Sequence, residues 1–165
     1  MAVHNPSLAC GRAFALAALL TVITAGAAHA QTVEQVKSAV AAITAQRMVL
    51  YTAIQNLGDM GNGENAPVVS SVTGTAYLFD LAAGTVIAVA VTLPHMRDPD
   101  DAKQIRIQLQ QNMPPMLNVL DVNLKTMNGY MTLIRSPAVR AETTKVRDAM
   151  VVIRQQVQSM RTEAQ

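Results

Sequence analysis

The spacing of the apolar residues is the feature that most limits what this chain can fold into. From Val33 onward they recur in alternating steps of three and four, which places them on one stripe of an α-helix. Helices with such a stripe pack side by side at a shallow angle. We therefore predict an all-α fold in which the stripes of neighbouring helices meet in a common core.

Glycine and proline divide this repeat into separate helices. A polar, glycine-rich stretch at 58–65 ends the first helix, and Pro94 ends the second. Asp98 and Ser136 each precede a proline and are suited to begin a helix. Short connections favour antiparallel neighbours, so we predict an up-down antiparallel four-helix bundle. Its helices span about 33–57, 67–93, 99–135 and 137–160.

The third helix contains an irregularity. Its stripe from Leu117 to Ile134 does not extend backwards in phase, because Ile105 and Leu109 lie one residue out of register. Pro114-Pro115 separates the two phases, and each proline removes a helical hydrogen bond. We predict a third helix broken at Pro114-Pro115, with pieces at about 99–112 and 115–135. A five-helix bundle is the alternative.

The first thirty residues resemble a bacterial secretory signal peptide. Arg12 supplies a positive charge, Ala13–Ala25 is apolar, and Ala28-His29-Ala30 matches a small-x-small cleavage pattern. We predict cleavage after Ala30, which leaves 31–165 as a single helical domain in the periplasm or outside the cell. The chain's one cysteine, Cys10, lies in the part removed, so no disulfide is expected.

Composition argues against several functional classes. A net charge of +2 provides no basic surface that would indicate nucleic acid as a partner. The chain lacks Cys-x-x-Cys-His for haem, and no Glu-x-x-His pair is present for a di-iron centre. Ser70 and Ser71 have no histidine nearby in sequence that could serve as a base. We predict no cofactor, no catalytic residues and no enzymatic activity.

Methionine supports one alternative function. The chain has ten methionines, and exported methionine-rich proteins can bind Cu(I) through thioether sulfur. The best candidate ligands are His95, Met96, Met113 and Met116. Most other methionines fall on the apolar stripes, where flexible side chains fill gaps in a core with 3% aromatic residues.

The second predicted helix carries more apolar residues than one stripe requires. Leu81–Leu93 is interrupted only by threonine as a polar residue, and Leu81, Ile87, Val89 and Val91 extend its apolar character around the helix. Either the third helix, a dimer partner or a lipid surface would cover these side chains.

Charged residues on or beside the stripes form two further candidates. Arg140, Arg147, Arg154 and Arg161 recur every seven residues along the last helix, where they could face a partner or cover the edge of the core. Arg47 occupies a stripe position, which predicts that it pairs with a carboxylate and fixes helix register. Its candidate partners are Asp80 and Asp121.

Together these patterns predict an exported helical bundle that acts as an interaction, accessory or chaperone-like module. Its partner would be another protein or a second copy of the chain as a homodimer. The alternatives are a periplasmic copper-binding protein and a protein that associates with a membrane surface through its second helix.

Overall fold

The computed structural model describes the backbone of residues 7–163 and the side chains of residues 34–160. The chain divides into two compact units, Met1–Gln35 and Val36–Gln165. In the first unit the described residues, 7–35, are helical and belong to α1, Ser7–Met60, which extends beyond the predicted 33–57 at both ends. The predicted signal peptide lies in this unit, outside the residues whose side chains are described, and it stays a prediction.

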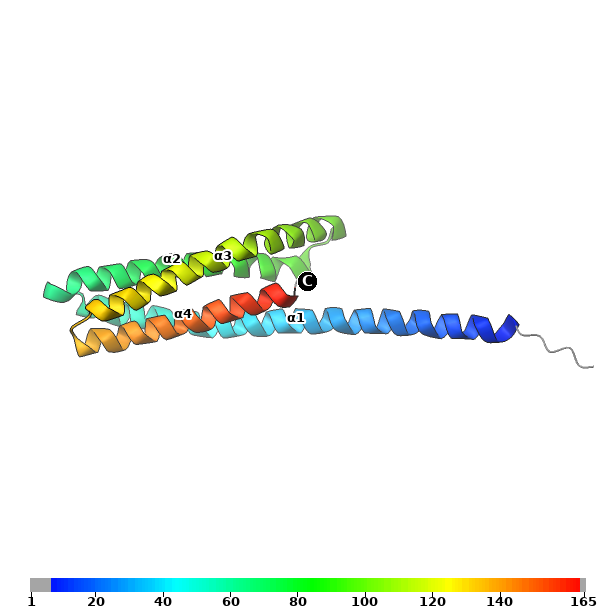
Figure 1. Cartoon of the computed structure of the whole chain (residues 1–165), viewed down its shortest axis with the longest axis horizontal. Coiled ribbons are helices and arrows are strands. Elements are labelled where there is room, and N and C mark those ends of the chain that lie inside the picture. Colours follow the sequence, from blue (N-terminus) through cyan, green and yellow to red (C-terminus); the bar gives the residue numbers. More distant parts are fainter. Residues whose placement is uncertain (1–6, 164–165) are drawn as a thin grey trace, which may run out of the picture. The chain divides into compact units, whose positions relative to one another are not determined.

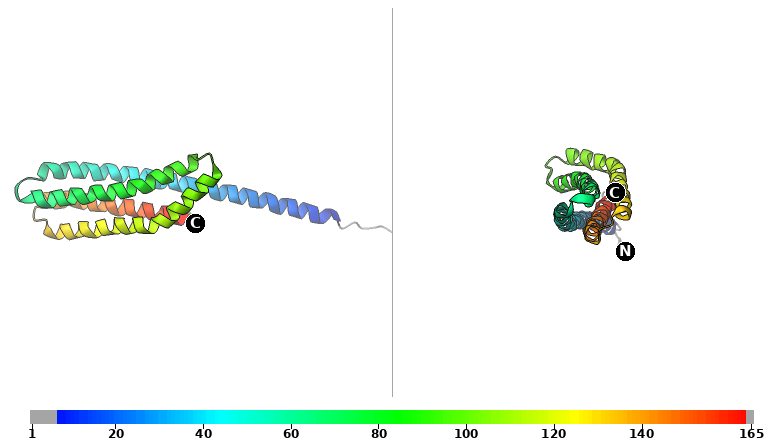
Figure 2. Two further views of the ribbon diagram at one scale, coloured as in Figure 1. Left: turned by 90° about the horizontal axis from the view of Figure 1, so that it is seen from above. Right: turned by 90° about the vertical axis from the view of Figure 1, so that its left-hand side faces the viewer.

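The second unit consists of four helices packed together, and its described residues contain no strand (Figure 1). This confirms the predicted all-α class. Seen from one end, the helices surround a common core (Figure 2). After α1 the elements are the 3-10 turn η1 (Gly63–Asn65), α2 (Ala66–Thr92), the 3-10 turn η2 (Leu93–His95), α3 (Pro99–Leu133) and α4 (Pro137–Glu163).

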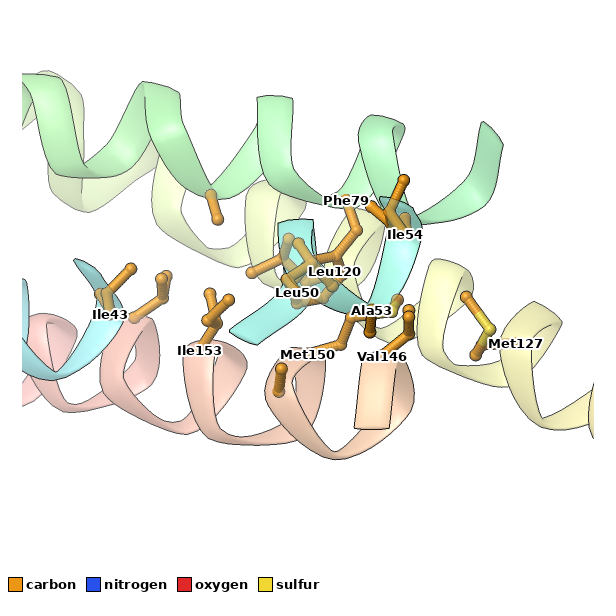
Figure 3. Close-up of a cluster of buried hydrophobic side chains, with 14 of the residues drawn as sticks. Ile43, Leu50, Ala53, Ile54, Phe79, Leu120, Met127, Val146, Met150 and Ile153 are labelled. Atoms are coloured by element: carbon orange, nitrogen blue, oxygen red, sulfur yellow. The ribbon is translucent and has the colours of Figure 1, made fainter. Parts of the chain in front are cut away.

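The predicted apolar stripes form the core. The stripe residues of α2 are all buried: Val69, Val72, Ala76, Phe79, Ala83, Val86 and Ala90. So are those of α4: Val139, Thr143, Val146, Met150, Ile153, Val157 and Met160. Figure 3 shows side chains of all four helices meeting between the ribbons, and each fully buried Leu, Ile or Phe contributes roughly 1.5–3 kcal/mol. The largest fully buried side chains include Ile43, Leu50, Phe79, Leu120, Met150 and Ile153.

The helix ends follow the sequence signals. The Asp98 carboxylate accepts hydrogen bonds from the backbone amides of Asp100 and Asp101 and so caps α3. Ser136 Oγ accepts a hydrogen bond from the Val139 amide at the start of α4. In the turn between α1 and α2, Gly63 has a φ of +53°, a conformation that side chains with a Cβ rarely adopt. Local sequence chemistry therefore sets where α3 and α4 begin.

The third helix differs from its prediction. α3 is one helix, with Pro114 and Pro115 inside it, so the predicted division into two helices is not confirmed. Its axis curves along its length (Figure 2). Both proline rings are exposed, while Met113 and Leu117 on either side are buried in the core. Burial of these side chains offsets the cost of about 3 kcal/mol for a proline in a helix interior.

The predicted change of phase is nevertheless present within this single helix. Ile105 and Leu109 are half-buried, while Arg106 and Gln110 are exposed. No residue of α3 before Met113 is fully buried. The first part of α3 therefore packs less completely than the part that follows the prolines.

Candidate interaction surface

The side of α2 that faces away from the core is the strongest candidate for a functional surface. Asp80 is the one charged residue between Ala66 and Thr92, and it is buried on the inner side of the helix. Arg47 of α1 binds it through two parallel hydrogen bonds, Nε to Oδ1 at 2.6 Å and Nη2 to Oδ2 at 2.7 Å. The predicted pairing of Arg47 with one of two aspartates is confirmed for Asp80. Asp121, the other candidate, pairs with Arg154.

Tyr51 completes this polar cluster, and the sequence analysis did not identify it. Its hydroxyl donates to Asp80 Oδ2 and accepts from Arg47 Nη2 at 3.1 Å. The hydrogen bond with Asp80 raises the pKa of Arg47 and is the main cause that raises the pKa of Tyr51. Tyr51 lies four residues after Arg47, on the same helix face, and that spacing was the available signal. The cluster joins α1 to α2 and leaves no charge for the outer side of α2.

The exposed side of α2 is consequently uncharged along the whole helix. The fraction exposed to solvent is 53% for Tyr77, 61% for Leu78 and 70% for Leu81. Ala88 and Val91 continue the same side, and the small residues Gly74 and Thr85 also lie on it. Apart from the adjacent Tyr77 and Leu78, successive positions from Gly74 to Val91 are three or four residues apart, so they lie on one side of the helix. We call Tyr77, Leu78, Leu81, Ala88 and Val91 the α2 outer face.

The structure separates the four apolar residues that the sequence singled out on this helix. Leu81 and Val91 are exposed on the α2 outer face. Ile87 is half-buried against the core, and Val89 is half-buried in the lining of a cavity that α2 forms with α3. Sequence reasoning missed Tyr77 and Leu78, although both lie opposite the predicted stripe of α2.

The arginines of α4 make bonds within the chain. Arg140 donates to the carbonyl of Met131 at 3.0 Å and to that of Ile134, at the end of α3. Arg154 binds the Asp121 carboxylate of α3 with two hydrogen bonds of 2.8 and 3.0 Å, and Arg147 pairs with its neighbour Asp148. The Arg161 side chain lies outside the described residues.

One carboxylate of α4 is also buried. Glu142 accepts hydrogen bonds from Lys145 Nζ at 2.6 Å and from Asn56 Nδ2 of α1 at 3.1 Å. The bond from Lys145, followed by that from Asn56, lowers the pKa of Glu142. Both buried carboxylates of the described core, Asp80 and Glu142, therefore reach a side chain of α1.

The four predicted copper ligands lie in two groups. Met113 is buried and Met116 half-buried, and both line the cavity between α2 and α3. His95 is exposed in η2, Met96 follows it, and neither lines that cavity. Among the described residues no three His, Cys, Asp or Glu side chains gather in a way that could hold a metal ion.

Length and composition also identify one candidate membrane-spanning segment among the described residues. Among the described residues one segment, Gly63–His95, is long and apolar enough to cross a membrane, with a mean hydropathy of 1.9 in its most apolar window. One third of that window (33%) is buried inside the bundle, and core helices of soluble proteins meet the same criterion.

Comparison of the chain with models of protein families, with curated proteins and with solved structures finds no match.

Proposed function

We propose that this protein is exported and acts as an interaction module, of an accessory or chaperone-like kind, without enzymatic activity. The α2 outer face is its binding surface. The observation that carries this proposal is the exposure of Tyr77, Leu78 and Leu81 side by side on a helix whose only charge is buried. An exposed apolar patch of this kind usually marks a site of macromolecular contact.

The proposed architecture is an up-down antiparallel bundle whose third helix is kinked at Pro114-Pro115. The progression of colours along the helices in Figure 1 and the short connection at residues 134–136 support alternating helix directions. A kink is what two adjacent prolines favour in a helix interior. In this arrangement α2 lies between α1 and α3 and presents its remaining side to solvent.

A second copy of the chain is the partner that this surface fits best. Two copies of an uncharged face can meet across a two-fold axis without bringing like charges together. Gly74 and Ala88 are small enough to permit close approach of two helices. The large side chains of Leu78 and Leu81 would supply the buried apolar area.

Light scattering coupled to size-exclusion chromatography tests this partner. We expect the purified protein to have the mass of a dimer, and the double variant Leu78→Glu, Leu81→Glu to have the mass of a monomer. Val151→Glu is the matched control, because Val151 is exposed on α4, and this variant should remain dimeric. A monomeric parent protein would contradict the homodimer.

Sedimentation with liposomes separates the membrane alternative from the proposed one. A parent protein that pellets with vesicles, and loses this property in the double variant, would favour a lipid surface as the partner. Export is tested separately by the mass of the protein recovered from the periplasm of expressing cells. That mass should correspond to a chain that begins at Gln31, and an intact N-terminus would contradict the predicted cleavage.

A further inference from the structure

A cavity of about 490 Å³ lies between α2 and α3. Its walls are apolar on both sides. Val86 and Val89 form the wall on α2, and Ile105, Leu109, Met113 and Met116 form the wall on α3. Cavities that bind small molecules have volumes of about 300–1,000 Å³ and mostly apolar walls, so this one has the dimensions of a ligand site.

The phase change in α3 explains why the cavity exists. After the prolines, Leu117 and Leu120 follow the stripe into the core and are buried. Before them, Ile105 and Leu109 lie out of register with that stripe and stay half-buried. The first part of α3 therefore turns its apolar side chains toward α2 without filling the space between the two helices.

The polar groups of the lining indicate which ligand would fit. No charged side chain is among the described residues that line the cavity. The lining includes three polar side chains, of which Thr85 donates its hydroxyl hydrogen to the Leu81 carbonyl. The other two are the exposed amides of Gln108 and Asn112, and each amide can both donate and accept a hydrogen bond.

We propose that this cavity binds an uncharged apolar molecule that has a hydrocarbon chain and a neutral polar end. The chain would contact the valine, isoleucine and leucine walls, and the flexible Met113 and Met116 would adapt to its shape. The polar end would reach the amides of Gln108 and Asn112. An ionised end would find no opposite charge in the lining and would lose part of its hydration. This inference is independent of the proposed function, because Tyr77, Leu78 and Leu81 do not line the cavity.

Fluorescence titration with N-phenyl-1-naphthylamine, a neutral apolar dye, tests the proposal on the purified protein. We expect saturable binding to the parent chain. Ile105→Lys places a charge in the wall and should raise the Kd at least about tenfold. Ile107→Lys is the matched control, because Ile107 is exposed on the same helix outside the lining, and its Kd should stay within about twofold.

A second pair of variants changes residues of α2 instead of α3. Val89→Phe fills space in the wall on α2 and should also weaken dye binding, whereas Val91→Phe on the α2 outer face should not. Circular dichroism and thermal unfolding establish that each variant is folded. Absence of dye binding to the parent chain, or binding that only Leu81→Lys removes, would overturn the proposal.

Competition with ligands of equal chain length defines the chemical class. 1-Dodecanol should displace the dye at a concentration at least about tenfold lower than dodecanoate or dodecyltrimethylammonium, because both ions carry a charge that the lining does not pair. An ion that competes better than the alcohol would show that the neutral class is wrong.

Discussion

Helices α2 and α4 bury the same kind of apolar stripe but differ on the side that faces away from the core. The exposed side of α4 carries Arg140, Lys145 and Asp148, whereas that of α2 carries Leu78 and Leu81. Core packing depends on the inner stripe alone, and α4 shows that a charged outer side is compatible with it. The uncharged outer side of α2 is thus not a requirement of the fold, which is why we assign it to binding.

The two helices also use their buried carboxylates differently. Asp80 of α2 binds Arg47, a charged residue of α1, while Glu142 of α4 binds a neutral amide of α1 and a lysine of its own helix. The α2 carboxylate therefore holds two helices together through a charged pair. The α4 carboxylate makes a weaker connection between helices.

The largest expected change in the free energy of unfolding comes from a substitution on the inner side of α2, compared with one on its outer side. Phe79→Ala should lower the free energy of unfolding by about 3–5 kcal/mol, because Phe79 is fully buried and its loss leaves a cavity. Leu78→Ala, one residue away on the α2 outer face, should lower it by less than about 0.5 kcal/mol in the monomer. Urea denaturation measures both.

The dependence of these stability changes on protein concentration provides a further test of the difference between the two sides of α2. If the α2 outer face is covered in a dimer, the effect of Leu78→Ala should increase with concentration, because association stabilises only the folded chain. Equal and concentration-independent losses for Phe79→Ala and Leu78→Ala would show that the two sides of α2 do not differ as the structure indicates.

An intermediate effect compares the carboxylates. Asp80→Ala should lower the free energy of unfolding by about 1–3 kcal/mol, because it leaves the Arg47 guanidinium and the Tyr51 hydroxyl without their acceptor. The Arg47 side chain is 34% exposed, so water replaces part of the lost interaction and a larger effect is not expected.

Asp148→Ala on α4 is the matched control for this substitution. Asp148 is exposed and pairs only with its neighbour Arg147 among the described ion pairs, so its removal should change stability by less than about 0.5 kcal/mol. Thermal unfolding at neutral pH compares the two variants. A loss for Asp148→Ala as large as that for Asp80→Ala would contradict the distinction between α2 and α4.

The smallest effect is a pH dependence that originates in α4. Because the pKa of Glu142 is lowered in the folded chain, its carboxylate becomes protonated at a higher pH in the unfolded chain than in the folded chain. The stabilisation is fully present above the unfolded pKa, about 4.3, and is lost as the pH falls through the lower folded value. Lys145 is exposed, so the effect is partly screened by solvent.

Glu142→Gln should remove this contribution while keeping the size of the side chain. The parent chain should be more stable than the variant at neutral pH, and the difference should shrink below pH of about 4. Urea denaturation across this pH range provides the measurement, with Asp148→Asn as the control. A difference that grows on acidification would have the wrong sign for the lowered pKa.

Much of the fold could be predicted because helix formation and stripe position depend on local spacing. The starts of α2, α3 and α4 were predicted to within about a residue, from Pro67, Asp98 and Ser136. The division at Pro114-Pro115 was not confirmed, since whether a proline pair ends a helix depends on the packing of Met113 and Leu117 around it. That packing is a tertiary property.

The candidate sites were predicted less completely. Sequence alone placed Arg47 on a stripe and offered two aspartates as its partner, but the choice of Asp80 required the positions of α1 and α2 relative to each other. The cavity could not be predicted, because its volume depends on how far the first part of α3 lies from α2.

By itself the sequence determined that this protein is helical, where α2, α3 and α4 begin, and most of the residues that form the core, since these follow from the periodicity and local signals of one chain. Only the tertiary structure decided which apolar residues beyond the stripes stay exposed, which carboxylate Arg47 binds, and where the core remains unfilled. Exposure, pairing and volume are properties of several helices at once, and no spacing within a single helix specifies them.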